Sequence, residues 1–410
     1  MKIDKKHLLN YSILIPYLIL SVLGLIVVYS TTSPTSIQAG GNGFGMVLNQ
    51  GIFWVISLFI IALLYRIRLG FLKKGGILTI VIFAEIILLL LSRFITGTIN
   101  GAHGWLKLGA FSIQPAEYLK IILVWYLAFR FTKRQEEIKV YDYQALTHNH
   151  WFPKAFNDWR TMVAILIGIV AIMPDLGNAT ILFLTVVIMI AVSGIGYRWF
   201  STMLGAIVSV SGLVLTSIWI IGVERVAKIP VFGYVAKRFS AFFNPFKDLS
   251  GSGHQLANSY YAMSNGGWFG LGLGNSIEKR GYLPEAHTDF VFSIVIEEFG
   301  FFGASLILAL LFFLILRIIL VGIRAKNAFN SMMALGIGGM ILMQTFINIG
   351  GISGLIPSTG VTFPFLSQGG NSLLVLSVAI ALVLNIDANE RRDALYEQME
   401  VEAQGRSEEA

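Results

Sequence analysis

Long apolar runs separated by short polar segments make up most of this chain of 410 residues. Each run is close to the roughly 20 residues that an α-helix needs to cross the hydrocarbon core of a membrane. The pattern predicts an all-α integral membrane protein with about ten transmembrane helices and no soluble domain of any size. The predicted spans are residues 11–30, 47–65, 76–92, 113–131, 161–173, 178–195, 199–223, 288–316, 331–350 and 371–387.

The fifth and sixth spans come from one apolar stretch, Met162 to Ile195. As a single helix, its 34 residues would be roughly 51 Å long, against a hydrocarbon core of about 30 Å. Pro174, Asp175 and Gly177 lie at its middle, and this combination is typical of a turn. We therefore predict two short helices joined by a tight outer turn, with Asp175 as a turn or helix-cap residue.

The distribution of basic residues predicts the orientation of the chain. Most of the 30 Lys and Arg residues lie in the tails and loops that ten spans place on one side, which the positive-inside rule assigns to the cytoplasm. Merging spans five and six would move the C-terminal arginines outside, against this rule. We expect both termini in the cytoplasm, residues 1–390 as one polytopic domain and residues 391–410 as a cytoplasmic tail.

Composition agrees with a membrane protein, since 55% of the residues are hydrophobic and only 13% are charged. A typical soluble domain carries roughly twice that share of charge. The first apolar run is too long for the core of a signal peptide and is predicted to stay as a span. The chain has no cysteine, which excludes disulfides, thiolate metal sites and cysteine nucleophiles. No nucleic-acid partner is expected.

Two predicted outer segments differ from simple connectors. Residues 224–287 form a long external loop, and between Val226 and Phe246 its basic residues alternate with aromatic and apolar ones. This favours a helix in the headgroup plane, either plainly solvated or a seat for an anionic group such as a pyrophosphate. Residues 350–370 are uncharged, with six glycines and two prolines. They are either a re-entrant segment beside a cavity or a surface loop.

Ionisable residues inside predicted spans are costly and are therefore candidates for function. Glu117 and Lys120 share one helix face and could either pair with each other or contact a substrate. Glu85 is predicted to make a buried hydrogen bond. Glu297 and Glu298 are adjacent, so they must point to different sides, and at least one is predicted to have a structural role.

Several motifs, in one order and at one spacing, resemble the SEDS family of cell-wall glycosyltransferases across nearly the whole chain. They are Gln114–Lys120, Pro174–Gly177, Gly266–Ser276, Gly281–Phe290, Glu297–Gly300 and Pro364–Gly370. Ser259–Trp268 and Asn385–Asn389 are most similar to the cell-division branch of Gram-positive bacteria rather than the elongation branch. The chain departs from the family pattern at Ser367–Ser372, and at Trp105, which the family often precedes with arginine.

The resemblance implies polymerisation of lipid II, an undecaprenyl-pyrophosphate disaccharide-pentapeptide, at the outer face of the bacterial cytoplasmic membrane. Its implied catalytic base is Asp289, which accepts a proton from the attacking sugar hydroxyl. A structural alternative for Asp289 is the N-cap of span eight. The implied substrate-binding residues are Lys279, Arg280, Glu285, His287, Thr288, Glu117, Lys120, Ser367, Gln368, Gly369 and Gly370.

The leaving pyrophosphate is an anion, so cations are needed to stabilise it. Either Lys279 and Arg280 would do so directly, or a divalent cation, Mg or Mn, would bridge the pyrophosphate to a carboxylate. Membrane lipids surround such a protein. The resemblance further implies a class B penicillin-binding protein as partner, contacting spans eight and nine, together with other division proteins at the septum.

A lipid flippase and a non-catalytic division scaffold are the alternatives. A flippase would have the same number of spans, with its intramembrane charges along a route between leaflets, but would not need an outer carboxylate base. A scaffold would explain the spans and leave the basic loop and Asp289 without a role. Turnover of lipid II by the purified protein separates the three hypotheses.

Overall fold

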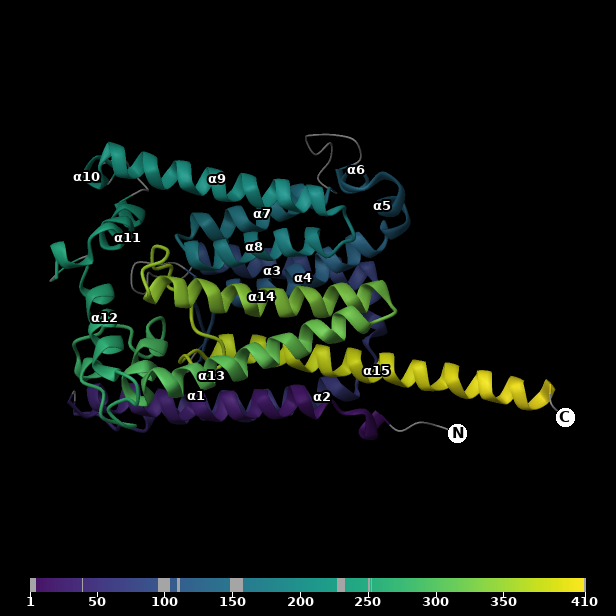
Figure 1. Ribbon diagram of the computed structural model, residues 1–410, viewed down its shortest axis with the longest axis horizontal. Helices are drawn as coiled ribbons and strands as arrows, with labels where there is room; N and C mark the ends of the chain where they lie inside the picture. Colours follow the sequence, from purple (N-terminus) through teal and green to yellow (C-terminus); the bar gives the residue numbers. More distant parts are fainter. Residues whose placement is uncertain are drawn as a thin grey trace.

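The protein is a bundle of long helices that run side by side along its longest dimension (Figure 1). This fold is seen in a computed structural model of the chain. The structure describes residues 5–38, 40–94, 104–108, 111–147, 158–226, 233–249, 251 and 253–408. His103 lies outside the described residues, as does Lys228 of the basic outer loop.

A helix overlaps each of the ten predicted spans. These helices are α1 (Tyr11–Gln38), α2 (Gly45–Arg66), α3 (Gly75–Phe94), α4 (Pro115–Thr132), α7 (Trp159–Ile172), α8 (Leu176–Ala191), α9 (Tyr197–Ile221), α13 (Val291–Arg324), α14 (Ala328–Ile352) and α15 (Gly370–Glu408). Within the described residues, seven of these helices are long and apolar enough to cross a membrane. α7 and α8 are shorter apolar helices. The all-α multi-pass membrane fold is confirmed, and the number of crossings stays a prediction.

The remaining elements are short and lie mainly between these helices. They are η1 (Lys5–Leu8), η2 (Leu69–Lys73), β1 (Leu106–Leu108), β2 (Phe111–Ile113), α5 (Gln135–Tyr141), α6 (Tyr143–Thr147), α10 (Val223–Val226), α11 (Gly233–Phe243), η3 (Pro245–Lys247), α12 (His254–Gly266) and η4 (Glu278–Arg280). β1 and β2 form an antiparallel hairpin in which Leu106 pairs with Ile113. Part of the outer loop is thus helical.

The turn between α7 and α8 is built as predicted. α7 ends at Ile172 and α8 begins at Leu176. The carboxylate of Asp175 caps α8, because its Oδ1 accepts a hydrogen bond from the backbone N–H of Asn178 at 3.1 Å. This satisfies one of the backbone donors that a helix start leaves without a partner.

Two helix bounds differ from the prediction. α13 begins at Val291 rather than 288 and runs to Arg324, with a kink at Gly300, whose φ is 72°. The glycine-rich segment before it packs into the kink, since the N–H of Leu271 donates to the carbonyl of Glu297 at 2.9 Å. α15 continues to Glu408, so the predicted boundary at residue 390 does not coincide with the end of a helix.

The two ends of the bundle carry different elements (Figure 1). α11 and α12 lie at one end, while η1 and the last turns of α15 lie at the other. α14 and α15 are central, because 72% and 89% of the residues in their most apolar stretches are buried. By contrast, no residue of α9 is buried. The first and last described elements therefore share one end of the bundle, as an even number of spans requires.

Residues 361–369 fold back into the bundle, whereas Ser353, Leu355 and Gly360 before them are exposed. Phe363 and Leu366 are fully buried, and polar side chains of α14 hold the backbone of the segment. Gln344 Nε2 donates to the carbonyl of Thr362 at 3.0 Å, and Asn348 Nδ2 donates to that of Val361 at 2.6 Å. The protein thus satisfies the polar backbone, as the re-entrant alternative requires.

Candidate active site

A cavity of about 620 Å³ opens at the α11 end of the bundle. Its walls come from the start of α4, the α7–α8 turn, α11, the residues before α13, and the folded-back segment after α14. Among the described residues of its lining, the acidic ones are Glu117, Asp175, Glu285 and Asp289, and the basic one is Arg238. The cavity therefore joins four of the sequence motifs with the basic outer helix.

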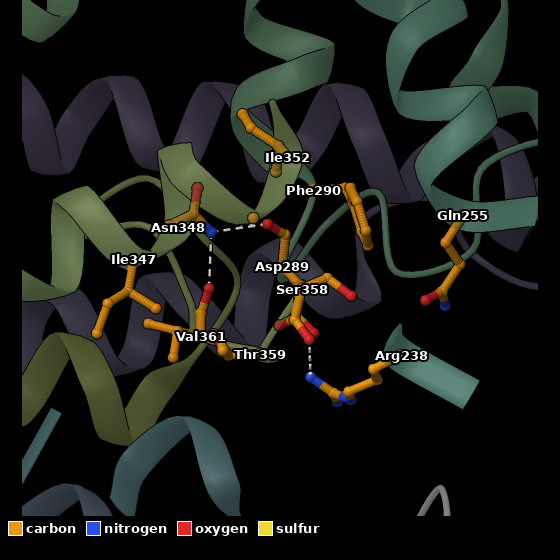
Figure 2. A pocket seen from close by; sticks show the side chains of 12 residues that line it. Arg238, Gln255, Asp289, Phe290, Ile347, Asn348, Ile352, Ser358, Thr359 and Val361 are labelled. Atoms are coloured by element: carbon orange, nitrogen blue, oxygen red, sulfur yellow. Dashed lines mark hydrogen bonds between the residues drawn. The ribbon is translucent and has the colours of Figure 1, made fainter. Parts of the chain in front are cut away.

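Asp289 lies in the turn just before α13, and its backbone is anchored to α14. Asn348 Nδ2 donates to the carbonyl of Asp289 at 2.7 Å and also to that of Val361, which links this turn to the opposite wall (Figure 2). The N-cap residue of α13 is Phe290, and no side chain caps it. The alternative of Asp289 as a helix cap is wrong, which leaves its carboxylate to face the cavity.

The surroundings of Asp289 make its carboxyl group harder to ionise. Burial, followed by the nearby Glu285 and Asp175 carboxylates, raises the pKa of Asp289, and Arg238 lowers it in part, so that the pKa is about 7. Asp289 precedes α13, so this group lies outside the membrane-spanning helix. A carboxyl group with a pKa near neutral pH is well suited to accept a proton from a hydroxyl and to release it afterwards.

Arg238 reaches the same cavity from α11. Its guanidinium donates to the carbonyl of Ser358 at 2.5 Å, and Figure 2 shows it beside Asp289 in the adjoining part of the cavity. Gly360 lies close to both side chains, because a Cβ added there would lie 3.1 Å from Arg238 Nη2 and 3.2 Å from Asp289 Oδ2. Gly360 also has a φ of 77°, which favours glycine.

The Pro364–Gly370 motif supports the string that carries Asp289. Ser367 Oγ donates to the carbonyl of Thr288 at 2.6 Å, and the N–H of Gln368 donates to the carbonyl of His287 at 2.8 Å. Thr288 Oγ1 donates to Glu285 Oε2 at 2.8 Å. These contacts fix the loop before α13.

The predicted substrate-binding residues of these two strings divide into two groups. Glu285, Thr288, Gln368 and Gly369 line the cavity. His287, Ser367 and Gly370 do not line it, and of these Ser367 holds the loop through its bond to Thr288. Burial lowers the pKa of His287, with the Glu285 carboxylate opposing the shift, so its imidazole is neutral at neutral pH. A Cβ on Gly370 would lie 2.4 Å from the ring of Phe53.

Glu117 and Lys120 form the predicted ion pair, with Lys120 Nζ 2.8 Å from Glu117 Oε2. Both side chains are buried, and only Glu117 lines the cavity. Lys120 Nζ also lies 3.5 Å from Gln344 Oε1. For Glu85, a hydrogen bond was predicted, but its buried Oε1 has no partner among the described residues.

Lys279 and Arg280 are not brought to the cavity, contrary to the prediction. Lys279 is buried, and its Nζ lies 2.5 Å from Glu298 Oε1 and 2.7 Å from Ser30 Oγ. Arg280 is exposed and does not line the cavity. Glu297 points elsewhere and accepts from the N–H of Ile277 at 3.1 Å. The prediction that Glu297 and Glu298 point to different sides is confirmed, and both have structural partners.

Arg238 and Asn348 are the residues of the site that the motifs did not single out. Gln114 Nε2 donates to Asp175 Oδ2 at 3.1 Å and so joins two motifs at the cavity rim. The basic and aromatic pattern around Arg238, and a polar Asn348 inside an apolar run, were the available signals. Among the described residues, no group of three or more His, Asp or Glu side chains is arranged to hold a metal ion.

Comparisons with known proteins identify the class to which this fold and cavity belong. The FtsW, RodA and SpoVE family, described as cell cycle proteins, matches residues 11–392. The chain belongs to this family of multi-pass membrane proteins. It is 48% identical over 405 residues to a probable peptidoglycan glycosyltransferase FtsW of Lactococcus lactis, covering 97% of this chain and 96% of the relative.

Other relatives and solved structures agree. The probable peptidoglycan glycosyltransferase FtsW of Bacillus subtilis is 37% identical over 92% of this chain and 90% of its own length. A chain in a peptidoglycan synthase complex that coordinates polymerization and crosslinking has a TM-score of 0.71, at 24% identity, covering 93% of this chain and 98% of that one. Thermus thermophilus RodA has a TM-score of 0.63, at 21% identity, covering 93% and 97%. At these identities, the two structures show the fold.

Proposed function

We propose that this protein is a peptidoglycan glycosyltransferase that polymerises lipid II into glycan strands at the outer face of the bacterial cytoplasmic membrane. The observation that carries the proposal is the approach of Asp289 and Arg238 to the same part of one cavity, next to Gly360. A base and a cation are the two groups that this transfer needs. The names of the relatives support the same activity.

In the proposed reaction, a hydroxyl of the acceptor sugar attacks the anomeric carbon of the donor. The hydroxyl proton passes to the carboxylate of Asp289 as the new glycosidic bond forms. The bond from that carbon to the lipid pyrophosphate breaks with both of its electrons, and Arg238 stabilises the charge that develops there. A single displacement inverts the configuration at the anomeric carbon.

Arg238 takes over the role first predicted for Lys279 and Arg280, because it lines the cavity and they do not. A divalent cation, Mg or Mn, is the second way to neutralise the pyrophosphate. Mg binds through one or two carboxylates together with substrate phosphates, and Asp289 and Glu285 are the carboxylates beside Arg238 that would provide such ligands. Loss of turnover with a chelator, restored by Mg or Mn, would support this route.

The orientation follows from the ends of the bundle. The loops at the η1 end carry most of the basic residues, which the positive-inside rule assigns to the cytoplasm. This rule puts the cavity at the outer face. The relatives named FtsW support a role in septal synthesis during cell division.

A class B penicillin-binding protein is the proposed partner, together with other division proteins. The similar chain in a synthase complex supports a partner of this kind. Exposed apolar side chains on α13 and α14, such as Leu306, Phe313 and Phe346, offer a lateral surface for a single membrane helix.

Turnover by the purified full-length chain tests the proposal. With labelled lipid II in detergent or vesicles, glycan strands should form and undecaprenyl pyrophosphate should be released. Exchange of lipid II between leaflets without strands would instead favour a flippase. Neither strands nor exchange, with the penicillin-binding protein also present, would favour a scaffold.

A further inference from the structure

A second large cavity lies at the end of the bundle opposite the candidate active site. Its volume is about 760 Å³, and five separate segments of the chain meet there. They are η1, the α2–η2 connection, η2, the start of α14 and the middle of α15. The lining residues that carry charge are Lys5, Arg66, Arg68, Lys73, Arg392 and Asp393.

The charges of this cavity are poorly balanced. Five of the charged lining residues are basic and one is acidic. Arg66, Arg68 and Lys73 have no ion-pair partner among the described residues, and Arg392 lies 3.4 Å from Asp393. Burial and the neighbouring Arg392 lower the pKa of Lys5 to about 8. The cations therefore repel one another, and a bound anion would relieve that repulsion.

Several contacts hold the cavity in shape without neutralising it. Lys5 Nζ donates to Asn385 Oδ1 at 2.7 Å, and Tyr65 donates to the carbonyl of Lys5 at 2.8 Å. Asn389, which lines the cavity, donates to the same Asn385 oxygen at 2.7 Å. Neutral amides and hydroxyls thus position η1 between α2 and α15. The excess of basic over acidic groups in the lining therefore remains.

An apolar surface leads from this cavity along α2. Val55, Phe59 and Leu63 are exposed, and Ile67 continues the same spacing of four residues into the cavity lining. Residues four apart on a helix form one row, so these side chains make a continuous apolar strip. A soluble anion would not contact such a strip, whereas the acyl chains of a lipid would cover it.

We propose that this cavity binds the headgroup of an anionic phospholipid with two phosphates, from the leaflet at this end of the bundle. Basic pockets between membrane helices are typical seats for such headgroups. Two phosphates match five basic groups and one acidic group better than one phosphate does. The bound lipid would join η1, the end of α2 and α15. This inference is independent of the reaction at Asp289.

The test is lipid retention by the full-length chain, measured by native mass spectrometry. The wild type is purified in neutral detergent and titrated with cardiolipin, phosphatidylglycerol, phosphatidylcholine or inorganic pyrophosphate. The pocket variant combines Arg68→Gln, Lys73→Gln and Arg392→Gln. The matched control combines Lys74→Gln, Arg198→Gln and Arg324→Gln, three exposed bases outside the cavity lining, removing the same number of charges.

The wild type and the control should each retain one cardiolipin. The affinity of the pocket variant for cardiolipin should be lower by about tenfold or more. Lipid II polymerisation in neutral detergent should be the same for all three proteins. Equal losses in both triple variants would mean non-specific attraction and overturn the proposal. Competition by pyrophosphate as strong as that by cardiolipin would make the occupant a soluble phosphate, and would also overturn it. If the pocket variant does not fold, Arg392→Gln alone should show a smaller loss of cardiolipin affinity.

Discussion

Asp289 lies among groups that change its charge in opposite directions. Burial and the Glu285 carboxylate raise the pKa of Asp289, to about 7, while Arg238 opposes them. The group acts as a base only when it is ionised, so polymerisation should increase as pH rises. From pH 6 to pH 8, the ionised fraction of a group with a pKa of 7 rises about tenfold, and the initial rate should follow it.

Glu285 should also affect the pH profile of polymerisation. Glu285→Gln removes a negative charge near Asp289, which favours the ionised aspartate and lowers its pKa. The midpoint of the rate profile should therefore move to lower pH. Glu278→Gln is the control, because Glu278 does not line the cavity, and its profile should match the wild type. A rate that is flat or falls from pH 6 to pH 8 would contradict this assignment.

Arg238 and Arg280 give a matched pair at the residue scale. Arg238 lines the cavity, and Arg280 is exposed outside it. Arg238→Gln should lower the polymerisation rate by about a hundredfold, because a charge opposite the leaving group is lost. Arg280→Gln should stay within about twofold of the wild type. Melting temperatures of both variants check their folding. Equal losses of rate for both variants would mean that the overall positive charge of the outer loop matters, rather than Arg238 in particular.

At the scale of elements, the buried pair of Lys279 and Glu298 holds η4 against α13 and α1. Lys279→Met leaves Glu298 buried and unpaired, which should destabilise the protein by about 3–5 kcal/mol. Adding Glu298→Gln should recover part of that loss. Thermal unfolding of the purified variants measures both effects.

The activity of these variants separates a structural role from substrate binding. If Lys279 only stabilises the fold, the double variant should polymerise lipid II at nearly the wild-type rate per folded molecule. A large loss of rate in a stable double variant would restore the original prediction that Lys279 contacts the substrate.

Sequence patterns predicted helices, turns and local pairs well, because short-range chemistry determines them. The Pro174–Asp175 turn and the pair of Glu117 and Lys120 depend on residues close in the chain. Lys279 and Arg238 could not be distinguished this way, since both are basic residues of one outer loop. Only the packing of η4 on Glu298, and of α11 near Ser358, decides which of them reaches the cavity.

At the scale of the whole molecule, the bundle has one end for each side of the membrane. The absence of cysteine makes labelling of single introduced cysteines a direct test. A membrane-impermeant maleimide added to intact cells should label Cys at exposed positions 280 and 355, and should not label Cys at 139 or 326. After the membrane is opened, all four should react. Labelling at 139 and 326 but not at 280 and 355 in intact cells would invert the orientation.

We propose the Asp289 carboxylate as the base of glycan polymerisation. Asp289→Asn keeps the size of the side chain and removes its ability to accept a proton. No helix cap is lost, since Asp289 does not cap α13. Asp248→Asn, at an exposed position of the same outer loop and outside the cavity lining, is the matched control.

The decisive measurement is the initial rate of strand formation from lipid II by purified full-length wild type, Asp289→Asn and Asp248→Asn. Melting temperature and lipid II binding are measured on the same samples. Asp289→Asn should fold and bind lipid II while losing at least about a hundredfold in rate, and Asp248→Asn should remain near the wild type. A folded Asp289→Asn protein that polymerises lipid II at nearly the wild-type rate would contradict the account.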